Sequence, residues 1–195
     1  MKESKISNVF TFGVKEPQPN DTKVSYSQYT MYANCPHQWK LNYMDGNRSF
    51  DPSIHLVFGT AMHEVLQEWL DTLYNNSIDD ASKLDLGSML YENMLVEYKK
   101  MREQTGVEFS NPSQMEEFLE DGIEILNFVT KNRIDYFNTR HMNLVAIELP
   151  IYSKALDSHN VYLMGFLDLV FEDTYENKLQ ICLLYTSPSP RDATL

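Results

Sequence analysis

The stretch Val161-Tyr-Leu-Met-Gly-Phe-Leu-Asp-Leu-Val-Phe171 decides the fold of this chain. As a strand, it carries apolar side chains on both faces, with Asp168 among those of one face. A strand that is apolar on both faces is typical of the centre of an α/β sheet. A carboxylate in such a strand is costly unless it is hydrogen-bonded or binds a metal ion. Asp168 is therefore either a metal ligand at the mouth of the sheet or the cap of a turn at a frayed strand end.

The rest of the chain predicts helices first and strands afterwards. Ser25 and Gln28 have the spacing of a capping box, so a helix should begin there and run to about Asn34, with a second one starting at Cys35-Pro36. Apolar residues at helical spacing predict a long helix over 55–74, a helical insert over 84–104 and a helix over 113–137. Strands are expected over 143–153, 160–171 and from 179 onward, which gives an α/β or α+β fold.

Composition limits the classes of function. The 195 residues suffice for one domain with a proper core, and no apolar run approaches the roughly 18 residues of a membrane span. Two cysteines give no disulfide framework, so we expect a soluble cytoplasmic protein without a membrane partner. The formal net charge of −12 argues against nucleic-acid binding over the whole surface, although a local groove is not excluded. The acidic residues between 116 and 124 are expected to form a solvated helix face.

A second candidate for metal chemistry lies on the predicted long helix. His63 follows Gly59 by one helical turn in Phe58-Gly-Thr-Ala-Met-His63 and lies on the flank of the apolar face. A neutral imidazole is a common metal ligand, and Gly59 would let a strand or a substrate approach the helix closely. A single histidine on a helix is more often a satisfied core or surface residue. Together with Asp168 it becomes a candidate site.

Three segments, in this order, resemble the RecB-like branch of the PD-(D/E)XK nuclease superfamily, which includes CRISPR-associated RecB-like exonucleases. They are an opening helix with a Cys-Pro pair within Ser25–Lys40, the Gly-Thr-x-x-His helix ending at His63, and Glu148 followed by the Gly-x-x-Asp strand Gly165–Asp168. The resemblance covers about residues 25–181. It implies a restriction-endonuclease-like three-layer α/β core with a large helical N-terminal half.

The same resemblance implies that His63 and Asp168 are catalytic and bind Mg²⁺ or Mn²⁺. The family's next element, an acidic residue followed by any residue and a lysine, should begin at or next to Cys182, but Ile181-Cys-Leu-Leu-Tyr185 contains neither. Hard cations need several oxygen ligands, so one aspartate and one histidine would hold the ion poorly. We therefore expect this chain to be inactive and its full-length parent to be a nuclease.

The last residues change character abruptly. Residues 182–193 resemble the translation of a sequencing adaptor, in which case native sequence stops near Ile181 and the sheet is incomplete at the C-terminus; the alternative is a genuine proline-rich tail. The expected organisation is a flexible tail over 1–22, a partial nuclease domain over 23–181 and a non-native segment over 182–195.

Further residues are candidates with more than one interpretation. Cys35 matches the first of four iron–sulfur ligands in some relatives, or is a plain buried cysteine. Glu148 contacts the metal, pairs with a lysine, or faces solvent. Tyr26, Tyr29 and Tyr32 stack on single-stranded bases, or pack within the fold. Lys40 completes the candidate DNA-binding residues.

The functional hypotheses differ in what they predict for metal and DNA. The first is a metal-dependent DNA exonuclease of recombination, repair or phage replication, with a helicase or recombination protein as its partner. The second is a catalytically dead DNA-binding or scaffold relative of the same fold. The third is an unrelated helical interaction protein that binds no divalent metal.

Overall fold

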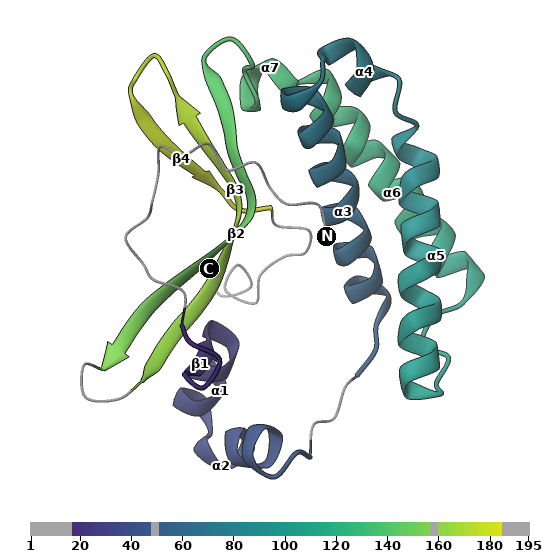
Figure 1. Cartoon of the computed structure of the whole chain (residues 1–195). Coiled ribbons are helices and arrows are strands. Elements are labelled where there is room, and N and C mark those ends of the chain that lie inside the picture. Colours follow the sequence, from purple (N-terminus) through teal and green to yellow (C-terminus); the bar gives the residue numbers. More distant parts are fainter. Residues whose placement is uncertain (1–16, 48–50, 157–159, 185–195) are drawn as a thin grey trace. The chain divides into compact units, whose positions relative to one another are not determined.

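The computed structural model describes residues 17–47, 51–156 and 160–184 of the chain (Figure 1). It divides into two compact units that are described separately. The first unit contains the residues up to Phe50 together with Val145–Val170. The second contains Asp51–Leu144 and the residues from Phe171 onward. The predicted tail over 1–22 and the segment over 182–195 therefore fall largely outside the described residues.

The sheet is organised around one strand, as the opening stretch predicts. Strand β3 (Val161–Asp173) pairs with β1 (Thr22–Ser25), with β2 (Met142–Leu156) and with β4 (Lys178–Cys182). β1 runs parallel to β3, from Thr22 opposite Val161 to Ser25 opposite Met164. The mixed α/β class is confirmed, and the sheet is open.

The prediction that β3 is covered on both faces is met in full only at one end of the strand. Leu169, Val170 and Phe171 are buried, so both faces are covered at this end of the strand. Farther back, Leu163 and Phe166 have 44% and 56% of their surface exposed. An apolar pattern identifies a strand, but it does not say which elements are available to cover each face.

The first unit begins with a short strand that the sequence did not predict. β1 has only four residues, too few for a visible period of two, and its pairing with β3 joins segments far apart in the sequence. Helix α1 (Tyr26–Asn34) follows at once. The predicted capping box is confirmed: Ser25 Oγ accepts a hydrogen bond from Gln28 N at 3.2 Å, and Gln28 Oε1 accepts one from Ser25 N at 3.3 Å.

Helix α1 leads into a second helical segment, as predicted. Helix α2 (Pro36–Trp39) starts with proline in its first turn and continues into a π-helical turn, η1 (Lys40–Met44). The Trp39 ring contacts Tyr32 edge-on at a centroid distance of 5.5 Å, and it contacts Tyr43 at 6.1 Å. These rings hold the two helical segments together.

The second unit is a helical bundle built on one apolar helix, α3 (Ile54–Asn75). Its buried residues recur every three or four positions, and the predicted bounds of 55–74 are confirmed within one residue. No helix in the described part of the chain is both long and apolar enough to cross a membrane. The other elements of this unit are α4 (Ile78–Ser82), α5 (Leu86–Thr105), α6 (Pro112–Lys131), α7 (Arg133–Tyr136) and β4.

The predicted helix over 113–137 is interrupted. Asn132 separates α6 from α7, and its side-chain Nδ2 donates a hydrogen bond to the Phe128 carbonyl at 2.7 Å. Asparagine side chains compete in this way for backbone partners, which favours a helix end. The acidic residues of α6 are all exposed, as expected: Glu116, Glu117, Glu120, Asp121 and Glu124.

Aromatic rings anchor the end of β3 in the second unit. Phe171 is 1% exposed and contacts Tyr74 of α3 at a centroid distance of 5.4 Å and Phe137 at 5.9 Å. Phe137 in turn contacts Trp69 at 6.0 Å. The Tyr74 hydroxyl is buried and has no hydrogen-bond partner among the described residues. Burial raises the pKa of this phenol to about 12.

Gly122 sets how closely α6 approaches α3 and α5. A Cβ atom there would overlap Leu90 Cδ2 and lie 2.9 Å from Phe58 Cε2, and both of these residues are buried. We predict that Gly122→Ala lowers the free energy of unfolding by about 1–3 kcal/mol, because overpacking outweighs alanine's better helix propensity. Urea unfolding followed by circular dichroism measures this. Gly87→Ala, where the new atom meets Ile123 at an ordinary 3.6 Å, is the control; equal effects of the two variants would contradict the packing argument.

Tyr74 gives a pH-dependent prediction. Because its pKa in the folded protein exceeds the ordinary value of 10.0, its contribution to stability is complete below pH 10 and is lost as the pH rises through about 12. Tyr74→Phe should remove this loss and also a buried hydroxyl without a partner. At pH 7 we expect the variant to unfold at the same or a higher urea concentration than wild type. Between pH 10 and 12 its stability relative to wild type should increase. A larger alkaline loss in the variant would refute the assignment.

Candidate active site

His63 lies on α3, half-buried between the apolar face and solvent, as its spacing predicts. Its Nε2 atom is 2.6 Å from the backbone carbonyl oxygen of Leu184. Because a carbonyl oxygen only accepts hydrogen bonds, Nε2 must carry the proton in this contact. Nε2 therefore cannot ligate a metal ion while the contact is made, which leaves Nδ1 as the other ring nitrogen.

The contact brings the end of β4 to α3 inside the second unit. The Leu184 side chain packs against the core cluster that α3 forms with α5 and α6. The residues just after β4 are thus fixed beside His63, although the sequence alone indicated no such contact. This is the segment in which the acidic residue and the lysine were expected. Cys182 and Leu184 stand there instead, and Cys182 is half-buried.

Asp168 lies in the part of β3 that belongs to the first unit. It is half-buried, not fully buried as the apolar pattern suggested, and it precedes the buried triplet that begins at Leu169. The predicted turn cap after this strand is provided by another residue: Asp173 Oδ1 accepts hydrogen bonds from Tyr175 N and Glu176 N. β3 continues to Asp173, so Asp168 does not lie at the frayed strand end that the turn-cap alternative required. His63 belongs to the other unit, so the metal site they would share stays a prediction.

Glu148 has an unusual backbone for a residue inside a strand. Its φ is +50°, in the left-handed region that a side chain with a Cβ atom disfavours, and its side chain is exposed. It lies on β2 in the first unit, as Asp168 does on β3. Strained backbone of this kind persists only where the surroundings hold it, which makes Glu148 a position to test.

The structure separates the three tyrosines of α1. Tyr26 and Tyr29 are 60% and 57% exposed and line the same groove. Tyr32 is 53% exposed, contacts Trp39 edge-on and does not line that groove. Stacking and packing both stay predictions for this residue. Lys40 forms an exposed ion pair with Asp45 at 3.0 Å, which offsets part of the charge that it would bring to DNA.

Cys35 has a structural role that the sequence did not indicate. Its Sγ atom accepts a hydrogen bond from Gln38 N at 3.4 Å and so caps α2, while its own N–H closes the last turn of α1. It is half-buried. The iron–sulfur role suggested by the resemblance stays a prediction.

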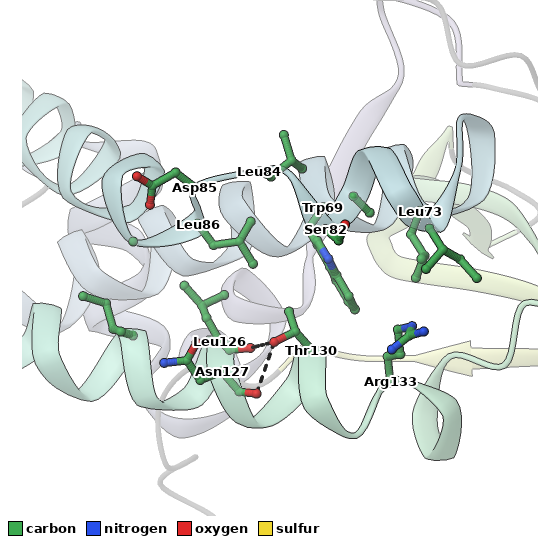
Figure 2. A pocket seen from close by; sticks show the side chains of 14 residues that line it. Trp69, Leu73, Ser82, Leu84, Asp85, Leu86, Leu126, Asn127, Thr130 and Arg133 are labelled. Carbon is green, nitrogen blue, oxygen red and sulfur yellow. Dashed lines mark hydrogen bonds between the residues drawn. The ribbon is translucent and has the colours of Figure 1, made fainter.

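A cavity of about 600 Å³ in the second unit offers an alternative location for a site (Figure 2). Trp69 and Arg133 lie on its walls, but none of the candidate residues does. The Thr130 hydroxyl donates to the Leu126 and Asn127 carbonyls within its own helix. Asp85 accepts hydrogen bonds from Ser88 N and Ser88 Oγ, which hold the pKa of Asp85 below its ordinary value. Thr130 and Asp85 thus make hydrogen bonds within their own helices, and the cavity contains none of the residues of the candidate site.

The donor set of this chain is too small for a hard divalent cation. Across residues 17–47, 51–156 and 160–184, no three His, Cys, Asp or Glu side chains gather into a group that could hold one. The predicted ligands supply one imidazole and one carboxylate, and a thiol stands where the second carboxylate was expected. The residues present therefore do not fit a complete Mg²⁺ or Mn²⁺ site.

Comparison with known families identifies the class of protein. The profile of the PD-(D/E)XK nuclease superfamily matches residues 23–182, most of the chain. The chain therefore belongs to the PD-(D/E)XK nuclease superfamily, which makes it a nuclease-type domain with DNA as the implied substrate. No match was found among curated proteins. The hypothesis of an unrelated helical interaction protein is wrong.

Glu148 gives a test of the strained strand. Relative to Glu148→Ala, Glu148→Gly should raise the free energy of unfolding by about 1 kcal/mol, because glycine adopts a positive φ without the Cβ penalty. Both variants lack the carboxylate, so their difference isolates the backbone. Equilibrium unfolding in urea measures it. A glycine variant less stable than the alanine variant would show that the left-handed conformation is not maintained in solution.

Proposed function

We propose that this domain comes from a metal-dependent DNA exonuclease of the RecB-like branch. Its site would combine His63, Asp168 and an acidic side chain at the end of β4, with Mg²⁺ or Mn²⁺ as the metal. Family membership supports the nuclease chemistry. The 2.6 Å contact between His63 Nε2 and the Leu184 carbonyl supports an acidic ligand at the end of β4, because it brings that end of the strand to His63. That contact is the observation on which the proposal rests.

Two groups that the proposed hydrolysis needs are missing from the chain. Hydrolysis of a phosphodiester needs a cation to activate water and to offset charge on the phosphate. A carboxylate at position 182 would lie at the end of β4, two residues before the carbonyl that His63 contacts. A lysine at position 184 would bring a positive charge for the phosphate or the attacking water. With Cys182 and Leu184 in these places, the chain has no complete catalytic set.

Other parts of the proposal rest on the resemblance alone. They are exonuclease action, a place in recombination, repair or phage replication, a helicase or recombination protein as partner, an iron–sulfur cluster at Cys35 in the full-length parent, and the foreign origin of residues 182–195.

The proposal predicts that activity can be restored by two substitutions. The chain as given should not hydrolyse linear DNA in the presence of Mg²⁺. Cys182→Glu combined with Leu184→Lys should bind Mn²⁺ in calorimetric titration and produce hydrolysis that EDTA abolishes. Circular dichroism checks that the variant is folded, since Leu184 packs against the core. Cys182→Gln combined with Leu184→Met, of similar size but without charge, is the matched control and should remain inactive.

Three further results would contradict specific parts of the proposal. Robust cleavage by the unmodified chain would show that the acid and the lysine are not needed. Undiminished cleavage after Asp168→Asn in the restored variant would remove Asp168 from the site. A folded restored variant that binds DNA without binding Mn²⁺ would favour the catalytically dead DNA-binding relative.

A further inference from the structure

A groove of about 630 Å³ lies within the first unit, between α1 and the strands β2 and β3. Tyr26 and Tyr29 come from α1, Ile151 and Tyr152 from β2, and Leu163 from β3. We call it the tyrosine groove. Figure 1 shows α1 beside the half of the β2–β3 hairpin that carries these residues. The groove does not contain His63, Asp168 or the end of β4.

The tyrosine groove presents rings to solvent instead of burying them. Tyr26 and Tyr29 are three residues apart and so lie on one face of α1, and more than half of each side chain is exposed. Leu163 and Ile151 are also exposed, at 44% and 38%. Ring faces in this position can stack on flat, unpaired bases, which is how single-stranded nucleic acid is held without sequence preference.

Positive charge lies beside these rings. Lys23 Nζ is 5.8 Å from the centroid of the Tyr152 ring, within the range of a cation–π contact. Lys154 is exposed on β2, but it is not among the residues that line the tyrosine groove. Lys23 forms no ion pair with a described residue. Its charge is thus available for a phosphate group.

The charge of the chain is distributed in favour of this location. Residues 1–50 and 145–170 contain seven Lys or Arg and seven Asp or Glu residues, so their formal charge is zero. The remaining residues contain nine and 21, which accounts for the whole net charge of −12. A polyphosphate chain is therefore repelled by the second unit and not by the first.

We propose that the tyrosine groove binds single-stranded nucleic acid, with bases stacked on Tyr26 and Tyr29 and a phosphate near Lys23. In a duplex the ring faces of the bases are already stacked on one another, so only unpaired bases can use these tyrosines. The inference rests on the proposed nuclease function and deepens it. It makes the substrate a single strand, held on the first unit by residues other than those proposed for hydrolysis.

The test measures binding alone. The full chain is titrated into fluorescein-labelled dT15 and into a 15-base-pair duplex in EDTA, and fluorescence anisotropy is followed. We expect dT15 to bind more tightly than the duplex. Tyr29→Ala should weaken dT15 binding by at least about fivefold, and Tyr29→Trp should preserve it. Tyr91→Ala is the matched control, because Tyr91 is also a helical tyrosine and 51% exposed, but lies in the second unit.

The lysines give an independent measurement. Lys23→Gln should reduce the slope of log affinity against log salt by about 0.7, the value for one phosphate contact on a single strand. Lys99→Gln, an exposed lysine of α5 in the second unit, should leave the slope unchanged.

Three outcomes would overturn the inference. They are dT15 binding that is equal in Tyr29→Ala and wild type, an equal loss in Tyr91→Ala, and no binding of dT15 at all. If dT15 does not bind and light scattering shows a dimer that Tyr29→Ala dissociates, the groove is an interface between two copies of the chain. Because the assay contains EDTA, these results are independent of the restored-activity experiment, and either proposal can fail without the other.

Discussion

Burial of the apolar face of α3 is the constraint on which the second unit depends. Val57, Ala61 and Val65 are completely buried and share one core cluster with residues of α5 and α6. Close packing of this kind needs matching shapes, and Gly122 supplies the missing volume where α6 meets Phe58 and Leu90. The same helix carries His63 at the margin of its buried face, so the packing that stabilises the bundle also fixes the orientation of the candidate ligand.

Local signals in the sequence predicted local structure well. The Ser25 and Gln28 pair and the stripe of α3 each specify an element through residues a few positions apart, and both were confirmed. Strand β1 and the interruption at Asn132 were missed. The strand depends on a partner about 140 residues away, and the interruption depends on one side chain that competes for a carbonyl. Neither leaves a periodic pattern in the sequence.

At the candidate site, too, local features were predicted and contacts between distant segments were not. The sequence singled out His63, Asp168 and Glu148 by residue type, spacing and resemblance. It gave no sign that His63 contacts the Leu184 carbonyl, or that Glu148 has a positive φ, because both depend on how distant backbone segments meet. It also grouped Tyr32 with Tyr26 and Tyr29, since helical spacing alone does not reveal that one of the three rings contacts Trp39 edge-on. Tyr152 and Lys23 were not singled out from the sequence. They became candidates because Tyr152 lines the tyrosine groove and Lys23 lies beside its ring.

The unequal charge of the two units has a kinetic consequence. Repulsion makes an anionic polymer collide less often with the acidic helices of the second unit, whereas its collisions with the electrically neutral first unit are not reduced. The unit that the polymer contacts is thus selected before any close contact forms. Repulsion by the second unit makes this selection, and not attraction to the first. Added salt shortens the range of this selection to about 8–10 Å near physiological ionic strength. The acidic face of α6 is therefore more than a solubilising surface: it biases which of the two units a polyanion encounters.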